Sequence, residues 1–414
     1  MKKISIQLCF LVCVLTAMAQ GKQRKVVFII VDGIPADVIE KVATPSIDAI
    51  AKEGKYMRAG VGGEKDGYSQ TPTISAVGYN SLLTGTWVNK HNVWDNDIKE
   101  PNYNYWSIFR FLKEQYGAKK TAIFSSWTDN RTKLVGEGLS KTGKIKLDYH
   151  FDGYELDTIK FRQDEQRDFM RRIDETVTDA ASKTIKNDAP DLSWVYLEYT
   201  DDMGHMYGDS PQFYKAVELM DKQVGRIWGA IEYRRKQFNE EWLMVITTDH
   251  GRDEKTGKGH GGQTPRQRNT WIVTNLQNIN NYAKYYQPAI VDIMPTIARF
   301  MNINIDKRQA WEIDGTPLAG PISVAELKTN LIQSHIDISW KAMQPNGKVK
   351  VWLATTNDFK TGKQDSYSLM TEVPVINEHA LIDVSKLKSS FYKVVLEGEN
   401  NVMNKWLMIE NEGK

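Results

Sequence analysis

Residues that could bind a metal or act as a nucleophile recur in four short clusters along this chain. The clusters are Val31-Asp32-Gly33, the segment from Thr73 through Ser75 to Gly85, Asp201-Asp-Met-Gly204-His205, and Thr247-Thr-Asp249-His250-Gly251 with His260-Gly261-Gly262 shortly after it. Together they hold three of the chain's seven histidines and a matching set of aspartates. Imidazole and carboxylate in this proportion suit two zinc ions.

Each cluster has an ordinary explanation when it is taken alone. An Asp-Gly pair is usually a turn. The adjacent Asp249 and His250 could be a hydrogen-bonded pair in a core, and Asp-x-x-Gly-His is more often a loop than a ligand set. Several hydroxyls are also available as nucleophiles on chemistry alone: Thr71, Thr73, Ser75 and Ser81. The metal interpretation therefore depends on the clusters meeting in space.

The elements between the clusters predict how they meet. Continuous apolar runs predict buried strands at 25–31, 121–125, 192–199, 242–247 and 271–274. Helical patterns follow at 44–52, 76–84, 105–115, 162–186, 210–235 and 288–302. This alternation predicts an α/β fold, a mainly parallel sheet with helices on both faces. Each cluster lies just past a strand or at a helix start, the edge where open parallel sheets bind ligands.

The chain changes character after Asp314-Gly315-Thr316-Pro317. From about 333 onward the segments are short and alternating, with a Pro345-Asn346-Gly347 turn between two of them. This pattern predicts a small C-terminal antiparallel β-sandwich. We expect a catalytic domain at 20–325 and a sandwich of structural or docking role at 333–414.

The first residues have the pattern of a secretory signal peptide. Lys2 and Lys3 precede an apolar run, and Ala17-Met18-Ala19 supplies a cleavage pattern, so we expect a leader at 1–19 and a periplasmic or extracellular protein, secreted across the inner membrane. Without the leader, the 54 basic residues fall by two to equal the 52 acidic ones. Such a balance predicts no nucleic-acid polymer as partner. No later segment has the length and apolarity of a membrane span.

In these four clusters the sequence resembles the alkaline phosphatase superfamily, and within it the nucleotide pyrophosphatase/phosphodiesterase-like branch. The resemblance covers about 25–320 and includes all the clusters in family order. It implies two Zn²⁺ per chain, one held by Asp201, His205 and His260, the other by Asp32, Asp249 and His250 together with the nucleophile oxygen. Two such metals clamp the attacking and leaving oxygens of an in-line displacement.

The resemblance also selects the catalytic residues. The family nucleophile stands ten residues before the glycine of a Leu-Thr-Gly element, which is Ser75 here, with Thr73 as the alternative. Most phosphodiesterase relatives carry threonine at this position, so serine is a departure, though a chemically equivalent one. An asparagine twenty-one residues further on, Asn96 here, contacts a non-bridging phosphoryl oxygen in the family.

The residues around the clusters favour one reaction within the superfamily. Sulfatases have Pro and Arg soon after the modified residue, but Ser75 is followed by Ala-Val-Gly-Tyr. One group of monoesterases has Lys-x-Arg where this chain reads Ser126-Trp-Thr-Asp129, although Arg131 could compensate. Trp127 or Tyr79 could instead stack against the extra group of a diester. We therefore expect a type I phosphodiesterase/nucleotide pyrophosphatase that acts on small phosphate esters through a Ser75 phospho-enzyme. The alternatives are a phosphomonoesterase, a sulfatase and a non-catalytic glycan-binding protein.

Overall fold

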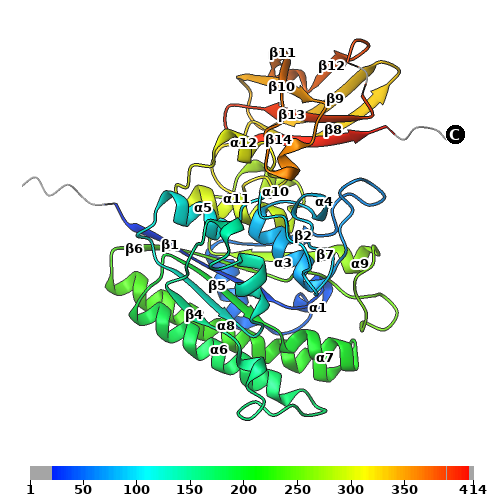
Figure 1. Ribbon diagram of the computed structural model, residues 1–414. Helices are drawn as coiled ribbons and strands as arrows, with labels where there is room; N and C mark the ends of the chain where they lie inside the picture. Colours follow the sequence, from blue (N-terminus) through cyan, green and yellow to red (C-terminus); the bar gives the residue numbers. More distant parts are fainter. Residues whose placement is uncertain (1–20, 388, 410–414) are drawn as a thin grey trace, which may run out of the picture.

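The computed structural model describes residues 21–387 and 389–409. The expected leader at 1–19 lies outside these residues. One seven-stranded sheet forms the centre of the molecule (Figure 1). In order across the sheet its strands are β2 (Lys55–Gly60), β7 (Asn269–Thr274), β6 (Glu240–Thr247), β1 (Gln23–Val31), β5 (Leu192–Leu197), β3 (Thr121–Ser125) and β4 (Tyr149–Phe151). The run from β6 to β4 is parallel, whereas β7 and β2 are antiparallel to their neighbours.

Helices cover both faces of this sheet because its strands are apolar on both sides. Val26, Phe28 and Ile30 of β1 belong to one hydrophobic cluster, and Val27 and Ile29 belong to another. The first cluster packs under α3 (Ser75–Thr84), α5 (Ile108–Gln115) and α11 (Ile293–Phe300). The second packs under α1 (Ala36–Ile39), α2 (Pro45–Glu53), α6 (Asp168–Asn187) and α8 (Pro211–Gln237).

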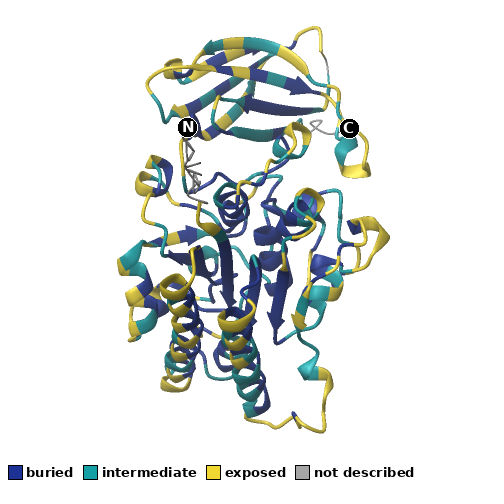
Figure 2. Ribbon diagram, turned by 90° about the vertical axis from the view of Figure 1, so that its left-hand side faces the viewer, coloured by how far each residue is buried: buried dark blue, intermediate teal, exposed yellow. Residues whose placement is uncertain are grey.

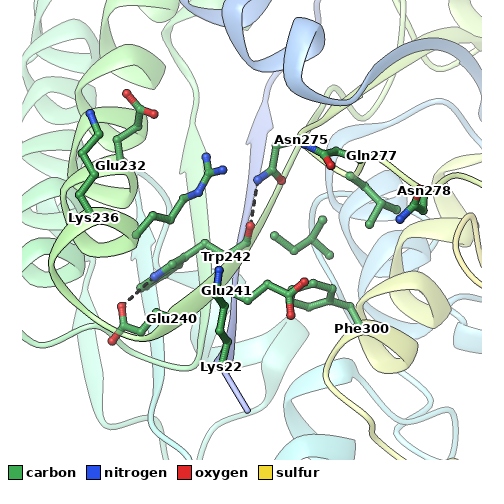
Figure 3. A pocket seen from close by; sticks show the side chains of 13 residues that line it. Lys22, Glu232, Lys236, Glu240, Glu241, Trp242, Asn275, Gln277, Asn278 and Phe300 are labelled. Atoms are coloured by element: carbon green, nitrogen blue, oxygen red, sulfur yellow. Dashed lines mark hydrogen bonds between the residues drawn. The ribbon is translucent and has the colours of Figure 1, made fainter. Parts of the chain in front are cut away.

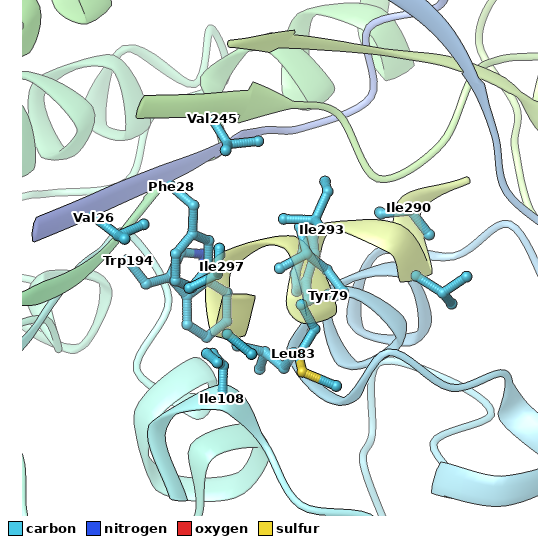
Figure 4. Packing of buried hydrophobic residues seen from close by; sticks show 14 of the residues in the cluster. Val26, Phe28, Tyr79, Leu83, Ile108, Trp194, Val245, Ile290, Ile293 and Ile297 are labelled. Carbon is cyan, nitrogen blue, oxygen red and sulfur yellow. The ribbon is translucent and has the colours of Figure 1, made fainter. Parts of the chain in front are cut away.

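The two clusters confirm the predicted α/β class with a mainly parallel sheet. Figure 4 shows the first cluster, in which Phe28 and Trp194 of neighbouring strands meet Ile297 of α11. Figure 2 shows where the buried residues lie: the central strands are buried, and exposed residues gather on the outer faces of the helices. Each fully buried side chain of this size contributes about 1.5–3 kcal/mol, so the sheet is a stable base for the loops at its edges.

Short elements at the ends of the strands were not expected from the sequence. The sequence patterns assigned no helix to the segment after β5, but it forms α7 (Tyr199–Tyr207). β2 and β4 were also missed, because both are short, with only part of β2 buried and no residue of β4 buried. The remaining short helices are α4 (Val88–His91), α9 (Pro265–Arg268), α10 (Asn281–Tyr285) and α12 (Lys307–Ala310). Among the described residues, no helix combines the length and apolarity that crossing a membrane requires.

Two antiparallel sheets follow the α/β part and lie at one end of the molecule (Figure 1). One contains β11 (Ser368–Pro374), β10 (Lys348–Ala354), β13 (Phe391–Glu397) and β14 (Val402–Met408), and the other contains β12 (His379–Asp383), β9 (His335–Ala342) and β8 (Val324–Ile332). Their inward side chains form a third hydrophobic cluster. The sequence pattern predicted this part to begin at about 333, but β8 already begins at Val324. A register shift between Ala325 and Lys328 interrupts the alternation of this strand, so its pattern is harder to detect.

Two fully buried lysines join these sheets to the α/β part. Lys90 of α4 donates from Nζ to the carbonyl of Glu312 at 2.8 Å and to Asn404 Oδ1 of β14 at 2.7 Å. Lys393 of β13 donates to Glu312 Oε1 and to Asp365 Oδ2, each at 2.7 Å. Because buried charges are tolerated only when they are paired, these contacts define how the two parts dock.

Candidate active site

The four sequence clusters meet at the carboxyl edge of the parallel strands. Asp32 directly follows β1, Asp249 and His250 follow β6, and α7 follows β5. The residues that meet form two groups of candidate metal ligands, Asp32–Asp249–His250 and Asp201–His250–His260, each with ligand atoms within 4.8 Å of one another. His250 belongs to both groups, so the two are adjacent.

The Asp32–Asp249–His250 group is buried, and its neighbours hold one oxygen of each carboxylate. Tyr196 donates its hydroxyl to Asp32 Oδ2 at 2.7 Å, and Tyr79 donates to the same oxygen. The backbone N–H that follows Asp32 donates to Asp249 Oδ1 at 3.1 Å. The two remaining oxygens, Asp32 Oδ1 and Asp249 Oδ2, lie 3.4 and 3.1 Å from His250 Nε2.

The predicted ligand set Asp201–His205–His260, which shares Asp201 and His260 with the second group, has two members on a helix. Asp201 and His205 are four residues apart on α7 and therefore on one face, with His205 Nε2 3.1 Å from Asp201 Oδ2. His260, on the loop after β6, brings its Nε2 to 3.0 Å from His205 Nε2. The His260 ring also stacks on His250, with 3.8 Å between centroids. Thus all six predicted ligands are brought together.

The donor set fits metal ions in two respects. Asp32 Oδ1 and Asp249 Oδ2 are buried and accept no hydrogen bond from the described residues, which is costly unless a cation is their partner. His250 Nδ1 lies 3.0 Å from the Gly251 carbonyl, and His260 Nδ1 lies 3.0 Å from the Thr73 carbonyl. Donation from Nδ1 leaves each Nε2 lone pair directed at the group, the usual arrangement of metal-binding histidine.

The electrostatics of the cluster point the same way. Burial raises the pKa of Asp32 well above its ordinary value, and the charges of Asp249 and Asp201 raise it further. Burial and then Asp201 raise the pKa of Asp249 to about 7. Burial would also raise the pKa of Asp201, but the Arg252 guanidinium, together with His205 and His250, holds that pKa below the ordinary value. Burial lowers the pKa of His250, so its imidazole is neutral, as a ligand must be. A cation among these carboxylates would relieve their mutual repulsion.

Ser75 is the hydroxyl that faces this cluster. It is the first residue of α3 and is 7% exposed, and its Oγ lies 3.4 Å from His250 Nε2. The other three candidate hydroxyls have structural partners: Thr73 donates to the Gly262 carbonyl at 2.8 Å, Thr71 to the Ser69 carbonyl at 2.8 Å, and Ser81 to the Val77 carbonyl at 2.8 Å. Thr73 also accepts from Gly261 N at 3.0 Å, so it holds the His260 loop.

Asn96 lies beside Ser75 although it is distant in the chain. Its Oδ1 accepts a hydrogen bond from the backbone N–H of Ala76 at 2.9 Å. This contact fixes the orientation of the amide, because an oxygen that accepts here leaves Nδ2 as the outward donor. The side chain is exposed, so that donor remains available.

Tyr79 and Trp127, the two residues predicted to stack against a substrate, differ in how far they are buried. Tyr79 was predicted to face a substrate, but it is fully buried, and its hydroxyl bonds to Asp32 and lies 2.9 Å from the hydroxyl of Tyr196. It therefore lies behind a candidate metal ligand, because a buried hydroxyl requires a partner. Trp127 is half-buried at the end of β3, with its ring 6.4 Å from that of Tyr79.

Sequence reasoning missed two residues of the site. Tyr196 interrupts the apolar run of β5, and a hydroxyl in a buried strand is a detectable signal for a polar partner. Arg252 follows His250 by two residues and is fully buried among the candidate ligands.

A separate hollow of about 520 Å³ lies at the opposite, amino edge of the sheet and is not part of this site. That hollow is lined by Trp242, Asn275 and Phe300 among others, with Trp242 and Asn275 hydrogen-bonded to neighbours (Figure 3).

Comparison with known proteins agrees with this geometry. Residues 26–307 match the sequence profile of the family described as "Type I phosphodiesterase / nucleotide pyrophosphatase". Human ectonucleotide pyrophosphatase/phosphodiesterase family member 7 is 23% identical over 249 residues, which cover 56% of this chain and 49% of that protein. Venom phosphodiesterase CdcPDE of Crotalus durissus collilineatus is 24% identical over 246 residues, covering 56% of this chain and 27% of the relative.

These matches span about half, or less, of the length of the relatives. The solved structure of a 2-O GAG sulfatase covers 88% of this chain and 86% of its own, with a TM-score of 0.50 at 12% identity, and shows likeness of fold alone. The predicted resemblance to the alkaline phosphatase superfamily is confirmed. With its family match extending over most of the α/β part, this chain belongs to the type I phosphodiesterase/nucleotide pyrophosphatase family.

Proposed function

We propose that this protein is a two-zinc hydrolase that cleaves small phosphodiesters or nucleotide pyrophosphates, with Ser75 as its nucleophile. The observation that carries the proposal is the position of Ser75 Oγ, 3.4 Å from His250 Nε2, where the two ligand groups adjoin. Asp32, Asp249 and His250 would hold one Zn²⁺, and Asp201, His205 and His260 the other. Two bound divalent ions would neutralise the negative charge that develops on attacking and leaving oxygens.

The chain's own residues would perform the displacement as follows. Ser75 Oγ loses its proton to solvent and forms a bond to phosphorus while the bond to the leaving oxygen breaks. The leaving group departs as an alcohol or a phosphate, with any proton it needs taken from solvent, and a phosphoserine ester remains. A water molecule then attacks this ester and releases the phosphate product with free Ser75. Because Ser75 opens α3, the positive end of that helix faces the phosphoryl group. Asn96 would donate from Nδ2 to a non-bridging oxygen, oriented by its bond to Ala76 N.

The choice of a diester rests on the charges near Trp127. Arg131, the cation that could have matched a dianionic monoester, donates to Asp152 at 2.7 and 3.1 Å and to Glu137 at 2.8 Å. Its charge is therefore already balanced by two carboxylates. Asp129 adds a further negative group in the same segment and pairs with Lys133 at 2.8 Å. A dianion needs a fixed cation here, and a missing buried charge contact costs about 2–5 kcal/mol.

A substrate panel on the zinc-loaded protein tests this proposal. We expect a higher kcat/KM for bis-p-nitrophenyl phosphate than for p-nitrophenyl phosphate, and no turnover of the matching sulfate ester. A hundredfold preference for the monoester that Arg131→Ala removes would replace the diesterase by a monoesterase, with Arg131 as a substrate ligand. Less than one metal per chain after zinc reconstitution, without turnover, would support a binding protein instead.

Secretion forms part of the same proposal and rests on the apolar run after Lys2 and Lys3. The expected location is periplasmic or extracellular, where small phosphate esters are accessible. The C-terminal sandwich is proposed to have a structural or docking role. Cell fractionation followed by mass measurement of the mature chain would test the leader, because cleavage after Ala19 predicts one defined mass.

A further inference from the structure

Arg252 is a buried cation that contacts the candidate metal ligand Asp201. Its side chain is fully buried and donates to three separate segments. Nε donates to the Gly33 carbonyl at 2.9 Å, and one terminal nitrogen donates to the Lys258 carbonyl at 2.9 Å. The other terminal nitrogen donates to the Asp201 carbonyl at 2.8 Å and also to Asp201 Oδ1. One guanidinium thus connects the segments that carry Asp32, Asp201 and His260. Arg252 itself stands two residues after His250 in the chain.

The surrounding glycines leave the space that this side chain occupies. A Cβ at Gly204 would lie 2.1 Å from Arg252 Cζ, and a Cβ at Gly33 would lie 2.7 Å from its terminal nitrogen Nη2. Non-bonded heavy atoms do not approach this closely, so a side chain at Gly204 would displace the guanidinium. A side chain at Gly33 would displace it together with Asp201 Oδ1, which would lie 2.4 Å from that Cβ. The glycines of the Asp-Gly and Asp-x-x-Gly-His clusters therefore make room for Arg252, a reason that the sequence pattern did not reveal.

The two metal groups depend on Arg252 to different degrees. In the Asp201–His205–His260 group, Arg252 occupies Asp201 Oδ1 and so leaves Oδ2, which is 3.1 Å from His205 Nε2, as the available oxygen. In the Asp32–Asp249–His250 group, the corresponding oxygens are held by Tyr79, Tyr196 and a backbone N–H. Removing the guanidinium would free the only carboxylate of one group and neither carboxylate of the other.

We propose that Arg252 is a positioning residue that selectively maintains the Asp201–His205–His260 group as a metal site. The inference rests on the proposed two-zinc function. A planar guanidinium supplies donors in fixed directions, whereas the lysine ammonium is a point charge on a flexible chain. A positive charge at residue 252 is therefore not enough to hold Asp201 in place. The geometry of the arginine donors determines how well one of the two metals is retained.

Zinc titration by calorimetry, with metal content after dialysis, tests the proposal. For wild type we expect two retained zinc ions. For Arg252→Gln and Arg252→Lys we expect one retained ion and at least a tenfold weaker second site. Excess zinc should restore kcat while KM for the diester stays unchanged. Gly204→Ala, which pushes the guanidinium aside without changing any charge, should produce the same selective loss and serves as a second route if residue 252 variants fold poorly.

Arg234→Gln is the matched control. Arg234 is also buried and forms a two-pronged pair with Glu240, but at the amino edge of the sheet. We expect it to lower thermal stability and leave both zinc affinities unchanged. The proposal would be overturned if the Arg252 and Gly204 variants bound both zinc ions with wild-type affinity, or if both sites were weakened equally. Wild type that binds two zinc ions without cleaving diesters would sink the proposed function alone. Wild type that retains less than one ion would overturn both.

Discussion

At the scale of single residues, Ser75 differs from nearby hydroxyls in what its oxygen faces. Thr73 uses both its donor and its acceptor on the loop of Gly261 and Gly262, whereas Ser75 Oγ is directed at His250. The two hydroxyls are close in the chain and similar in chemistry, so they form a natural pair of variants. Only the removal of Ser75 should remove the group that bonds to phosphorus.

We expect Ser75→Ala to lower turnover of a diester by several orders of magnitude with both metals retained, because covalent catalysis has no substitute oxygen there. Thr73→Ala should cost roughly tenfold or less, the value of a lost hydrogen bond that positions His260. Steady-state kinetics with metal analysis of both variants provides the check. An active Ser75→Ala beside an inactive Thr73→Ala would reverse the assignment.

At the scale of elements, α7 places two candidate metal ligands next to each other. Asp201 and His205 share one face because they are four residues apart on a helix. The helix ends at Gly208, whose backbone angles, φ 62° and ψ −149°, are adopted almost only by glycine. A Cβ there would lie 2.0 Å from the Thr256 carbonyl oxygen, on the loop that leads to His260.

Gly208→Ala should therefore destabilise the protein by about 2 kcal/mol or more, since backbone strain and the clash with Thr256 add together. Thermal or denaturant unfolding measures the change. Gly229→Ala on α8 is the matched control. A Cβ at Gly229 meets nothing within 4 Å, so alanine there should be neutral or stabilise by up to about 1 kcal/mol. Equal stability of the two variants would argue against a strained end to α7.

At the scale of the whole molecule, buried charges rather than apolar contacts alone determine how the sandwich docks. Lys393 of β13 is paired with Glu312, which lies before the sandwich, and with Asp365 within it. Each partner is itself buried, with side chains 2% and 1% exposed. Removal of the lysine would leave two carboxylates without their cation in a dry interface.

We expect Lys393→Met to cost about 3–5 kcal/mol, the range for breaking one side of a buried ion pair. Lys341→Met is the matched control, because Lys341 is half-exposed and its pair with Glu378 is at the surface, where loss costs at most about 1 kcal/mol. Calorimetric melting of both variants decides the matter. A melting temperature unchanged in Lys393→Met would show that the sandwich is held by other contacts.

The amino-acid sequence alone predicted the order of the main strands and helices along the chain. β3 has the predicted bounds, and β1 and β6 extend only two residues beyond theirs. Continuous apolar runs produce this accuracy, because a strand buried on both faces has few alternatives. The family resemblance named the six candidate ligands, and the position of their clusters after strands predicted that they would meet at one edge of the sheet.

Contacts between distant side chains could be decided only by the folded chain. The aromatic ring of Tyr79 suggests a substrate contact, yet its hydroxyl donates to Asp32. Arg252, which no periodicity singled out, joins the segments of Gly33, Asp201 and Lys258. Asn96 bonds beside Ser75 through a loop whose path no local pattern specifies. Hydrophobic periodicity reports which face of an element is buried. Which polar group meets which depends on the packing of several elements at once.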